Sequence, residues 1–317
     1  MSRPAEAKRN ISIVIPVHNE EESAPRLHEE LSRMAASAPQ LQCEFIFVDD
    51  GSKDRSWDVL ESLHKRDPRV RAVRLKRNFG QTPAMACGIE QARGEFVVTM
   101  DGDLQNDPAD IPRMIEKLDE GYDLVCGWRH QRQDKLITRK IPSMVANRLI
   151  GLLTGVQLHD YGCSLKAYRA EAIKRTPLYA ELHRFIPAMS QLTGALVAEM
   201  KVNHRARKFG KTKYNLSRTW RVALDMITVS LIIKFAHKPL RFFGMMAIVP
   251  TLIGILSIER SWRWYFHQHT QIPQVLPSIA LASFWLAVHL WTVGLIAELC
   301  IATAHHRSQD LIAPRRG

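Results

Sequence analysis

Two aspartates separated by a single glycine, Asp101 and Asp103, have the spacing in this sequence that most directly suggests chemistry. They follow an apolar and β-branched run, Phe96–Met100, that is typical of a buried strand. Residues two apart in an extended segment point to the same face, so both carboxylates would project together from the end of that strand. Carboxylate oxygens are ligands for Mg²⁺ or Mn²⁺, which commonly bind together with a diphosphate. Taken alone, the motif could also be a solvated Asp-Gly turn.

The segment before Arg132 alternates strand-like and helix-like stretches. The strand-like stretches are 11–17, 43–50, 70–75, 95–101 and 122–128, and the helix-like ones are 20–37, 54–66, 82–93 and 108–119. This alternation predicts an α/β fold with a doubly wound, mainly parallel sheet and right-handed crossovers.

Polar clusters follow the carboxyl ends of four of these strands, at 16–20, 49–52, 78–81 and 101–105. Ligands bind at this edge of an open α/β sheet. The glycine patterns of dinucleotide-binding and P-loop proteins do not occur, so side chains and a metal are expected to hold the nucleotide.

Four motifs in this half resemble family 2 glycosyltransferases with the GT-A fold, in particular the branch that attaches a sugar to polyprenyl phosphates. They are VIPVHNEEE, VDDGSKDRS, RNFGQTPAMACGI and MDGDLQNDP. The usual Asp-Ala-Asp of the family is Asp-Gly-Asp here, and His18 stands where the family often has tyrosine.

The resemblance implies roles for individual residues. Asp101 would lie near the ribose and diphosphate, Asp103 would ligate the metal, and Gln105 would position the sugar phosphate; these three are the predicted catalytic residues. Pro16, Glu20 and Asp50 would contact the nucleoside. With Asn78 and Gln81 from the third polar cluster, and Asp101, they form the predicted nucleotide-sugar site.

Two later blocks, DYGCSLKAYR and RKFGKTKY, resemble those of bacterial undecaprenyl-phosphate aminoarabinose transferases and, less tightly, dolichol-phosphate mannose synthases. The resemblance implies four basic residues that hold the acceptor phosphate and donor diphosphate: Arg129, Lys166, Arg207 and Lys213. Lys166 stands where the mannose synthases use arginine, so its contact would be a point charge and not a fork. For each of the four, a solvated surface base is the alternative.

Two long apolar stretches, 240–258 and 275–299, are long enough to span a bilayer. Basic residues before the first and after the second outnumber Arg260 and Arg263 in the expected loop between them. The positive-inside rule then places both ends, and the catalytic domain, on the cytoplasmic side of the inner membrane. His289, near the middle of the second stretch, is expected to bond to a neighbouring helix.

The chain is therefore expected to consist of a glycosyltransferase domain, 1–235, and a transmembrane hairpin with a short tail, 236–317. Stretches 136–153 and 219–235 are amphipathic and basic, which predicts helices at the membrane interface. Ordinary packing of these helices against the sheet is the alternative.

The composition agrees with a cytoplasmic enzyme that meets an anionic partner. The formal net charge is +12, and the five cysteines are scattered without a C-x-x-C pair, which favours a reducing compartment. The first residues lack an apolar leader segment. Nucleic-acid binding, which charge alone would suggest, has no supporting fold signal.

The sequence thus predicts inverting transfer of a sugar from a nucleotide-sugar to polyprenyl phosphate, with Mg²⁺ or Mn²⁺ as cofactor. The resemblance favours a UDP-sugar over a GDP-sugar and implies a homo-oligomer. A phosphate nucleophile is already ionised near neutral pH, so no strong general base is required. Transfer to a glycan or another acceptor, and a membrane-tethered binding protein without catalysis, are the competing hypotheses.

Overall fold

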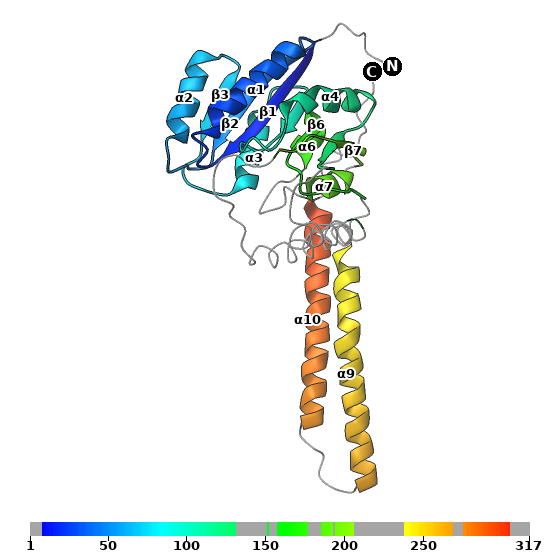
Figure 1. Ribbon diagram of the computed structural model, residues 1–317. Helices are drawn as coiled ribbons and strands as arrows, with labels where there is room; N and C mark the ends of the chain where they lie inside the picture. The colour runs from blue at the N-terminus through cyan, green and yellow to red at the C-terminus, as the bar shows by residue number, and fades with distance from the viewer. Residues whose placement is uncertain are drawn as a thin grey trace. The chain divides into compact units, whose positions relative to one another are not determined.

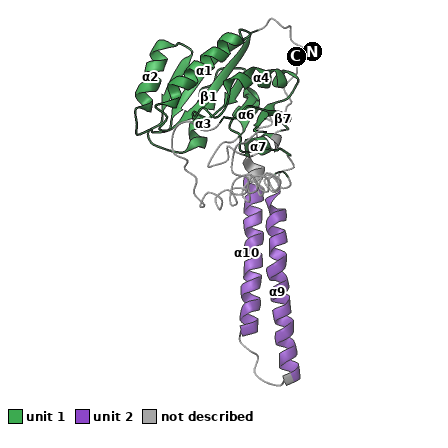
Figure 2. Ribbon diagram, in the orientation of Figure 1, with its two compact units in different colours: residues 1–229 green, residues 230–317 purple. Residues whose placement is uncertain are grey.

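The computed structural model describes residues 8–130, 151, 157–176, 185–192, 194–205, 238–268 and 275–304. The chain divides into two compact units, Met1–Val229 and Ser230–Gly317 (Figure 2). The expected domain boundary at 235 stays a prediction, as do the interfacial helices 136–153 and 219–235, which lie outside the described residues except for Gly151. Arg207 and Lys213 also lie outside them.

The first unit contains a seven-stranded sheet with helices on both faces (Figure 1). The strand order is β3-β2-β1-β4-β6-β5-β7, and pairing is parallel except for β6, which runs antiparallel to β4 and β5. The strands are β1 (Arg9–Val17), β2 (Leu41–Asp49), β3 (Val70–Arg74), β4 (Phe96–Thr99), β5 (Leu124–Trp128), β6 (Lys166–Arg169) and β7 (Val197–Lys201). The helices are α1 (Ser23–Ser37), α2 (Ser56–Arg66), α3 (Gln81–Gln91), the 3₁₀ helix η1 (Pro108–Asp110), α4 (Ile111–Asp119), α6 (Ala170–Arg175) and α7 (Ile186–Leu192).

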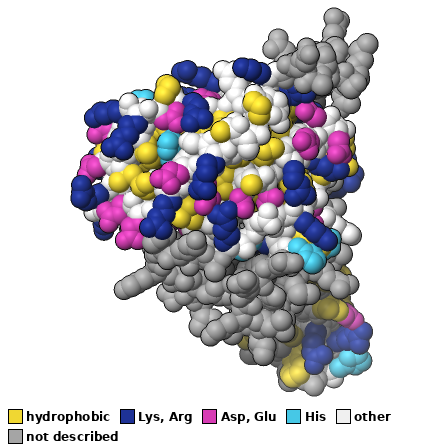
Figure 3. Space-filling model, turned by 45° about the horizontal axis from the view of Figure 1, so that its top comes forward, with side chains coloured by type: hydrophobic (Ala, Val, Ile, Leu, Met, Phe, Trp, Pro, Cys, Tyr) yellow, Lys and Arg dark blue, Asp and Glu magenta, His cyan; other side chains and the backbone are white. Residues whose placement is uncertain are grey.

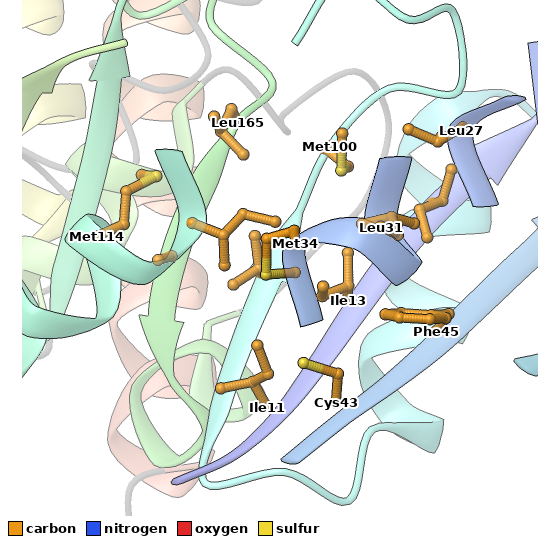
Figure 4. Packing of buried hydrophobic residues seen from close by; sticks show 14 of the residues in the cluster. Ile11, Ile13, Leu27, Leu31, Met34, Cys43, Phe45, Met100, Met114 and Leu165 are labelled. Atoms are coloured by element: carbon orange, nitrogen blue, oxygen red, sulfur yellow. The ribbon is translucent and has the colours of Figure 1, made fainter. Parts of the chain in front are cut away.

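Buried side chains fall into two layers, one on each face of the sheet. Apolar residues of α1, α2 and α4 pack on one face, where Leu27, Leu31 and Met34 of α1 lie over Ile13 and Phe45 (Figure 4). Residues of α3, α6 and α7 pack on the other face against Val14, Ile46 and Val97, among others. Strands buried on both faces need continuous apolar runs, which explains the composition of β1, β2 and β4. The doubly wound fold predicted from the sequence is confirmed.

Two strands were not predicted. They are β6 and β7, and β7 begins at Val197, shortly after α7 ends at Leu192. β6 is only four residues long and β7 is only partly buried, so neither shows the apolar run that reveals the central strands. On the face of the molecule seen in Figure 3, acidic and basic side chains are interspersed over the first unit.

The second unit is a helical hairpin made of α9 (Pro239–Gln268) and α10 (Val275–Ala304). Pro239–His267 and Val275–Cys300 are long and apolar enough to cross a bilayer, each with a mean hydropathy of 1.9. Most of their large apolar side chains are exposed, as lipid-facing residues would be. α9 continues past the expected end at 258, so Arg260 and Arg263 belong to the helix and not to the loop.

His289 is exposed on α10, and its expected bond to a neighbour stays a prediction. Glycines bring the two helices together. A Cβ atom on Gly254 would lie 3.0 Å from the Phe284 ring, and one on Gly294 would lie 2.9 Å from the Phe243 Cβ. Near the same end, the Leu240 N–H donates to the Glu298 carboxylate over 3.2 Å, so α10 supplies an acceptor to the first turn of α9.

We expect Gly294→Ala to destabilise the hairpin, because the added methyl group would also lie 3.2 Å from the Leu240 Cα and the helices would have to separate. Gly244→Ala is the matched control, since its Cβ would meet only the Trp291 ring at 3.8 Å. Alanine should stabilise that helical position by about 0.5–1 kcal/mol. Thermal unfolding in detergent should show a lower Tm for Gly294→Ala only, and equal Tm values for the two variants would contradict the described packing.

Candidate active site

The register of the parallel strands brings three strand ends to one edge of the sheet. β1 pairs with β2 through Val17 and Asp49 and with β4 through Val14 and Thr99. A Cβ atom on Gly102 would lie 3.4 Å from the Pro16 carbonyl oxygen, so the turn after β4 passes directly beside the end of β1. Polar residues far apart in the sequence therefore meet at this edge.

In the turn after β4, 101–105, partly exposed and buried residues alternate. Asp101, Asp103 and Gln105 are partly exposed, whereas the intervening Gly102 and Leu104 are buried. The Gln105 N–H donates to Asp103 Oδ1 over 3.1 Å, which fixes the turn locally. The common face expected from the spacing of the two carboxylates stays a prediction.

Gln81, at the start of α3, reaches the same turn. Its Nε2 donates to Asp101 Oδ1 over 2.6 Å. The third and fourth polar clusters of the sequence therefore share a direct side-chain contact, and Gln81 sets the orientation of one carboxylate of the pair.

Asp50 links the second cluster to the third. Its side chain is only 4% exposed, and its carboxylate accepts hydrogen bonds from the N–H groups of Phe79 at 2.7 Å and Gly80 at 3.0 Å. Gly51 and Gly80 have φ angles of 64° and 101°, in the region that favours glycine. The carboxylate of Asp50 therefore organises the loop before α3, and its contact with the nucleoside stays a prediction.

The first cluster joins this network through His18. Its Nδ1 lies 3.0 Å from the Asp50 carbonyl oxygen and 3.1 Å from Asn78 Nδ2. The Glu20 N–H donates to Ser56 Oγ over 2.8 Å, which ties the loop before α1 to the start of α2. Pro16, Glu20, Asp50, Asn78 and Gln81 thus belong to one connected edge, although no contact shown here assigns them a ligand.

Arg129, just beyond β5, is held by a residue that the sequence did not single out. Its Nε and Nη2 donate to the Asp160 carboxylate over 2.6 and 2.9 Å, and the two side chains are 15% and 5% exposed. Burial lowers the pKa of Arg129, but the hydrogen bonds and charge of Asp160, with smaller contributions from Cys163 and Asp101, outweigh it and raise that pKa.

Lys166 lies in β6 and is 3% exposed. Its Nζ donates to the Cys163 carbonyl oxygen. This bond uses one of the three donors of the ammonium group, and the predicted contact of Lys166 with the acceptor phosphate stays a prediction.

The donor set fits a divalent ion that is shared with a ligand. Among the described residues, no group of three or more His, Cys, Asp or Glu side chains is placed to hold a metal by itself. Mg²⁺ and Mn²⁺ often take only one or two protein carboxylates and complete their coordination with phosphate oxygens and water. Asp101 and Asp103, both partly exposed and two residues apart, match that requirement.

The pattern of glycosyl transferase family 2 matches residues 12–176, the segment that forms this edge. The chain belongs to glycosyl transferase family 2. This family 2 chain is 41% identical over 302 residues to a dodecaprenyl-phosphate galacturonate synthase from Rhizobium johnstonii, covering 94% of this chain and 89% of the relative. It is 39% identical over 249 residues to an undecaprenyl-phosphate 4-deoxy-4-formamido-L-arabinose transferase from Pseudomonas aeruginosa, covering 78% and 71% of the two chains.

Solved structures of similar fold include glucosyl-3-phosphoglycerate synthase from Mycobacterium tuberculosis, in complex with Mn²⁺, UDP and glucosyl-3-phosphoglycerate. The TM-score is 0.54 at 19% identity, covering 70% of this chain and 79% of that one. At this identity the likeness concerns the fold, which is the GT-A fold expected from the sequence.

We expect Gly102→Ala to keep the fold and the orientation of both aspartates. Its Cβ would meet Pro16, Val17 and Ile15 atoms at 3.4–3.6 Å, which is ordinary contact, and the loss of a glycine should stabilise the chain by about 0.4–1 kcal/mol. Gly51→Ala is the contrasting variant, because its Cβ would lie 2.5 Å from the Arg77 carbonyl carbon at a φ of 64°. Differential scanning fluorimetry should show a clear loss of Tm only for Gly51→Ala, and a comparable loss for Gly102→Ala would contradict the geometry of the turn.

We expect Asp160→Asn to be strongly destabilising, because it leaves the buried Arg129 guanidinium without its charge partner. Breaking a buried ion pair by removing one partner typically costs about 3–5 kcal/mol. Asp119→Asn is the control: Asp119 pairs with Arg9 over 3.2 Å but is 39% exposed, and such pairs contribute about 0–1 kcal/mol. Thermal unfolding compares the two variants, and equal losses of Tm would show that the Arg129–Asp160 pair is not buried as described.

Proposed function

We propose that this family 2 glycosyltransferase transfers a sugar, with inversion, from a nucleotide-sugar to polyprenyl phosphate, and that the donor is a UDP-sugar. The observation that carries the proposal is the nearly full-length match to a dodecaprenyl-phosphate galacturonate synthase. The 6% of the chain outside that match (100% minus 94%) is shorter than either hairpin helix, so the similarity extends beyond the donor edge into both candidate spans.

The chemistry is a direct displacement. A phosphate oxygen of the acceptor forms a bond to the anomeric carbon of the sugar, while the bond from that carbon to the diphosphate breaks and its electron pair leaves with the nucleoside diphosphate. The acceptor oxygen carries no proton that must be removed, so the site needs orientation and charge compensation more than a general base.

The described residues are suited to these tasks. Asp101 and Asp103 would hold a divalent cation, Mg²⁺ or Mn²⁺, against the donor diphosphate, and Gln81 keeps Asp101 in place for that contact. When bound, the ion neutralises charge that develops on the leaving group. Gln105, in the same turn as the aspartates, would position the sugar phosphate.

The remaining predicted residues would bind the nucleoside of the donor and the phosphate of the acceptor. Pro16, Glu20, Asp50 and Asn78 would hold the nucleoside at the ends of β1 and β2. Arg129, with Lys166, Arg207 and Lys213, would hold the acceptor phosphate and reduce its repulsion from the donor. The hairpin would keep the enzyme at the cytoplasmic face of the inner membrane, where the acceptor lipid resides, and the homo-oligomer implied by family resemblance is part of the same proposal.

The product assay is the test of this function. Purified protein in detergent receives undecaprenyl phosphate, Mg²⁺ or Mn²⁺ and UDP- or GDP-linked sugars. The panel includes galacturonate and 4-deoxy-4-formamido-L-arabinose, the sugars that the relatives' names give. We expect mass spectrometry of the lipid extract to show a new glycosyl phospholipid that disappears with EDTA.

Asp103→Asn tests the site in parallel. Replacing a carboxylate by an amide removes the charge that binds the cation, so we expect product formation to fall at least about a hundredfold, as when a single electrostatic contact of a transition state is removed. Asp119→Asn, an exposed carboxylate at the end of α4, is the control and should keep full activity. Undiminished activity of Asp103→Asn, or transfer to a glycan in place of the lipid, would contradict the proposal.

A further inference from the structure

After β7, the chain returns to the turn that carries Asp101 and Asp103 (residues 101–105). Beyond β7, His204 forms an antiparallel bridge with Asn106, and the Arg205 N–H donates to the Gln105 carbonyl oxygen over 2.8 Å. The segment that leads into the basic RKFGKTKY block therefore lies alongside the residues that follow Asp103.

The Arg205 side chain joins Asp107, two residues beyond Gln105, to α1. Its Nη1 lies 2.8 Å from both carboxylate oxygens of Glu30, and its Nη2 lies 2.7 Å from Asp107 Oδ2. Burial lowers the pKa of Arg205, but its hydrogen bonds to Asp107 and Glu30 and their charges outweigh this effect and raise it. Because two carboxylates engage its guanidinium, Arg205 is suited to hold protein segments together.

Neighbouring contacts hold the residues that follow this turn. The Asn203 N–H donates to Asp110 Oδ2 over 2.6 Å, and Asn106 Nδ2 donates to Ser164 Oγ over 2.8 Å. Leu104, just before these residues, has a φ of 63°, a conformation that is unfavourable for a residue with a side chain. Such a residue persists only where its surroundings hold it, at a cost of about 1–3 kcal/mol.

We propose that Arg205 is a positioning residue that holds the turn carrying Asp103 and Gln105 in the conformation that binds the donor diphosphate. The inference rests on the proposed function. It assigns Arg205 a role beyond that of the predicted phosphate-binding bases, because Arg205 acts through the turn and not on a ligand. A displacement of about 1 Å in a reacting site can lower the rate about a hundredfold, so the clamp matters for catalysis as well as for folding.

The test compares Arg205→Gln with Arg69→Gln. The Arg69 side chain is 39% exposed, against 36% for Arg205. It pairs with Asp67 over 2.8 Å and donates to Ser32 of α1 over 3.1 Å. Arg69 lies just before the amino end of β3, the outermost strand, and not at the carboxyl ends of the strands. Both variants should lose some Tm. Only Arg205→Gln should weaken Mn²⁺-dependent binding of UDP or GDP in isothermal titration, by about tenfold or more, and lower kcat for lipid product while KM for the lipid changes little.

Two further variants separate positioning from general damage. Arg205→Lys keeps the charge but cannot bind two carboxylates in a fork, so its nucleotide affinity should fall between those of the wild type and Arg205→Gln. Glu30→Gln should weaken binding when made alone and add little to Arg205→Gln, because the two changes remove one interaction.

The outcomes distinguish this inference from the proposed function. If the wild type binds nucleotide but forms no lipid product, and Arg205→Gln still loses affinity, the acceptor assignment fails and the positioning role stands. Nucleotide affinity in Arg205→Gln equal to that in Arg69→Gln would overturn the positioning role, whatever the product. No nucleotide binding by the wild type would overturn both.

Discussion

The parallel pairing of β1 with β2 on one side and β4 on the other is the constraint on which the rest of this structure depends. It places the carboxyl ends of three strands at one edge, so the residues after each strand meet without any long loop. The pairing is stabilised by complete burial: Ile13, Ile15, Phe45 and Phe47 are 0% exposed, and each such side chain contributes about 1.5–3 kcal/mol. The close approach of α3, whose Gly88 would have a Cβ 2.4 Å from a Val14 methyl group, shows how tightly the opposite face is filled.

Polar contacts between the loops at the carboxyl ends of these strands hold the site residues in place. Hydrogen bonds connect the loops at this edge. The Asp50 carboxylate accepts hydrogen bonds from two backbone N–H groups of the loop before α3, and Gln81 donates to Asp101. The backbone N–H of Arg205 donates to the Gln105 carbonyl oxygen in the turn after β4. Buried charges are costly unless they are paired, and Asp160 meets that need for Arg129. The carboxylates suited to metal binding remain partly exposed, so a diphosphate could complete the coordination.

Much of this could be predicted from the sequence, for identifiable reasons. Continuous apolar runs reveal the central strands, and the spacing of Asp101 and Asp103 predicts their common face. β6 and β7 carry no such run, and the close approach of α9 and α10 at Gly254 and Gly294 is not encoded in hydropathy. Asp160 and Glu30 were missed because their importance comes from partners 31 and 175 residues away in the chain. Local patterns can identify a charged residue, but they do not show which distant charge it will meet.

The most direct test of the account is a cryo-EM structure of the protein in lipid nanodiscs with Mn²⁺ and UDP. We expect the diphosphate at the carboxyl ends of β1, β2 and β4, with an ion between it and the carboxylate of Asp103, and Arg205 still joining Glu30 to Asp107. A diphosphate bound away from this edge, or bound here with Asp103 turned from it and no ion between them, would contradict the central claim that this edge of the sheet is the donor site.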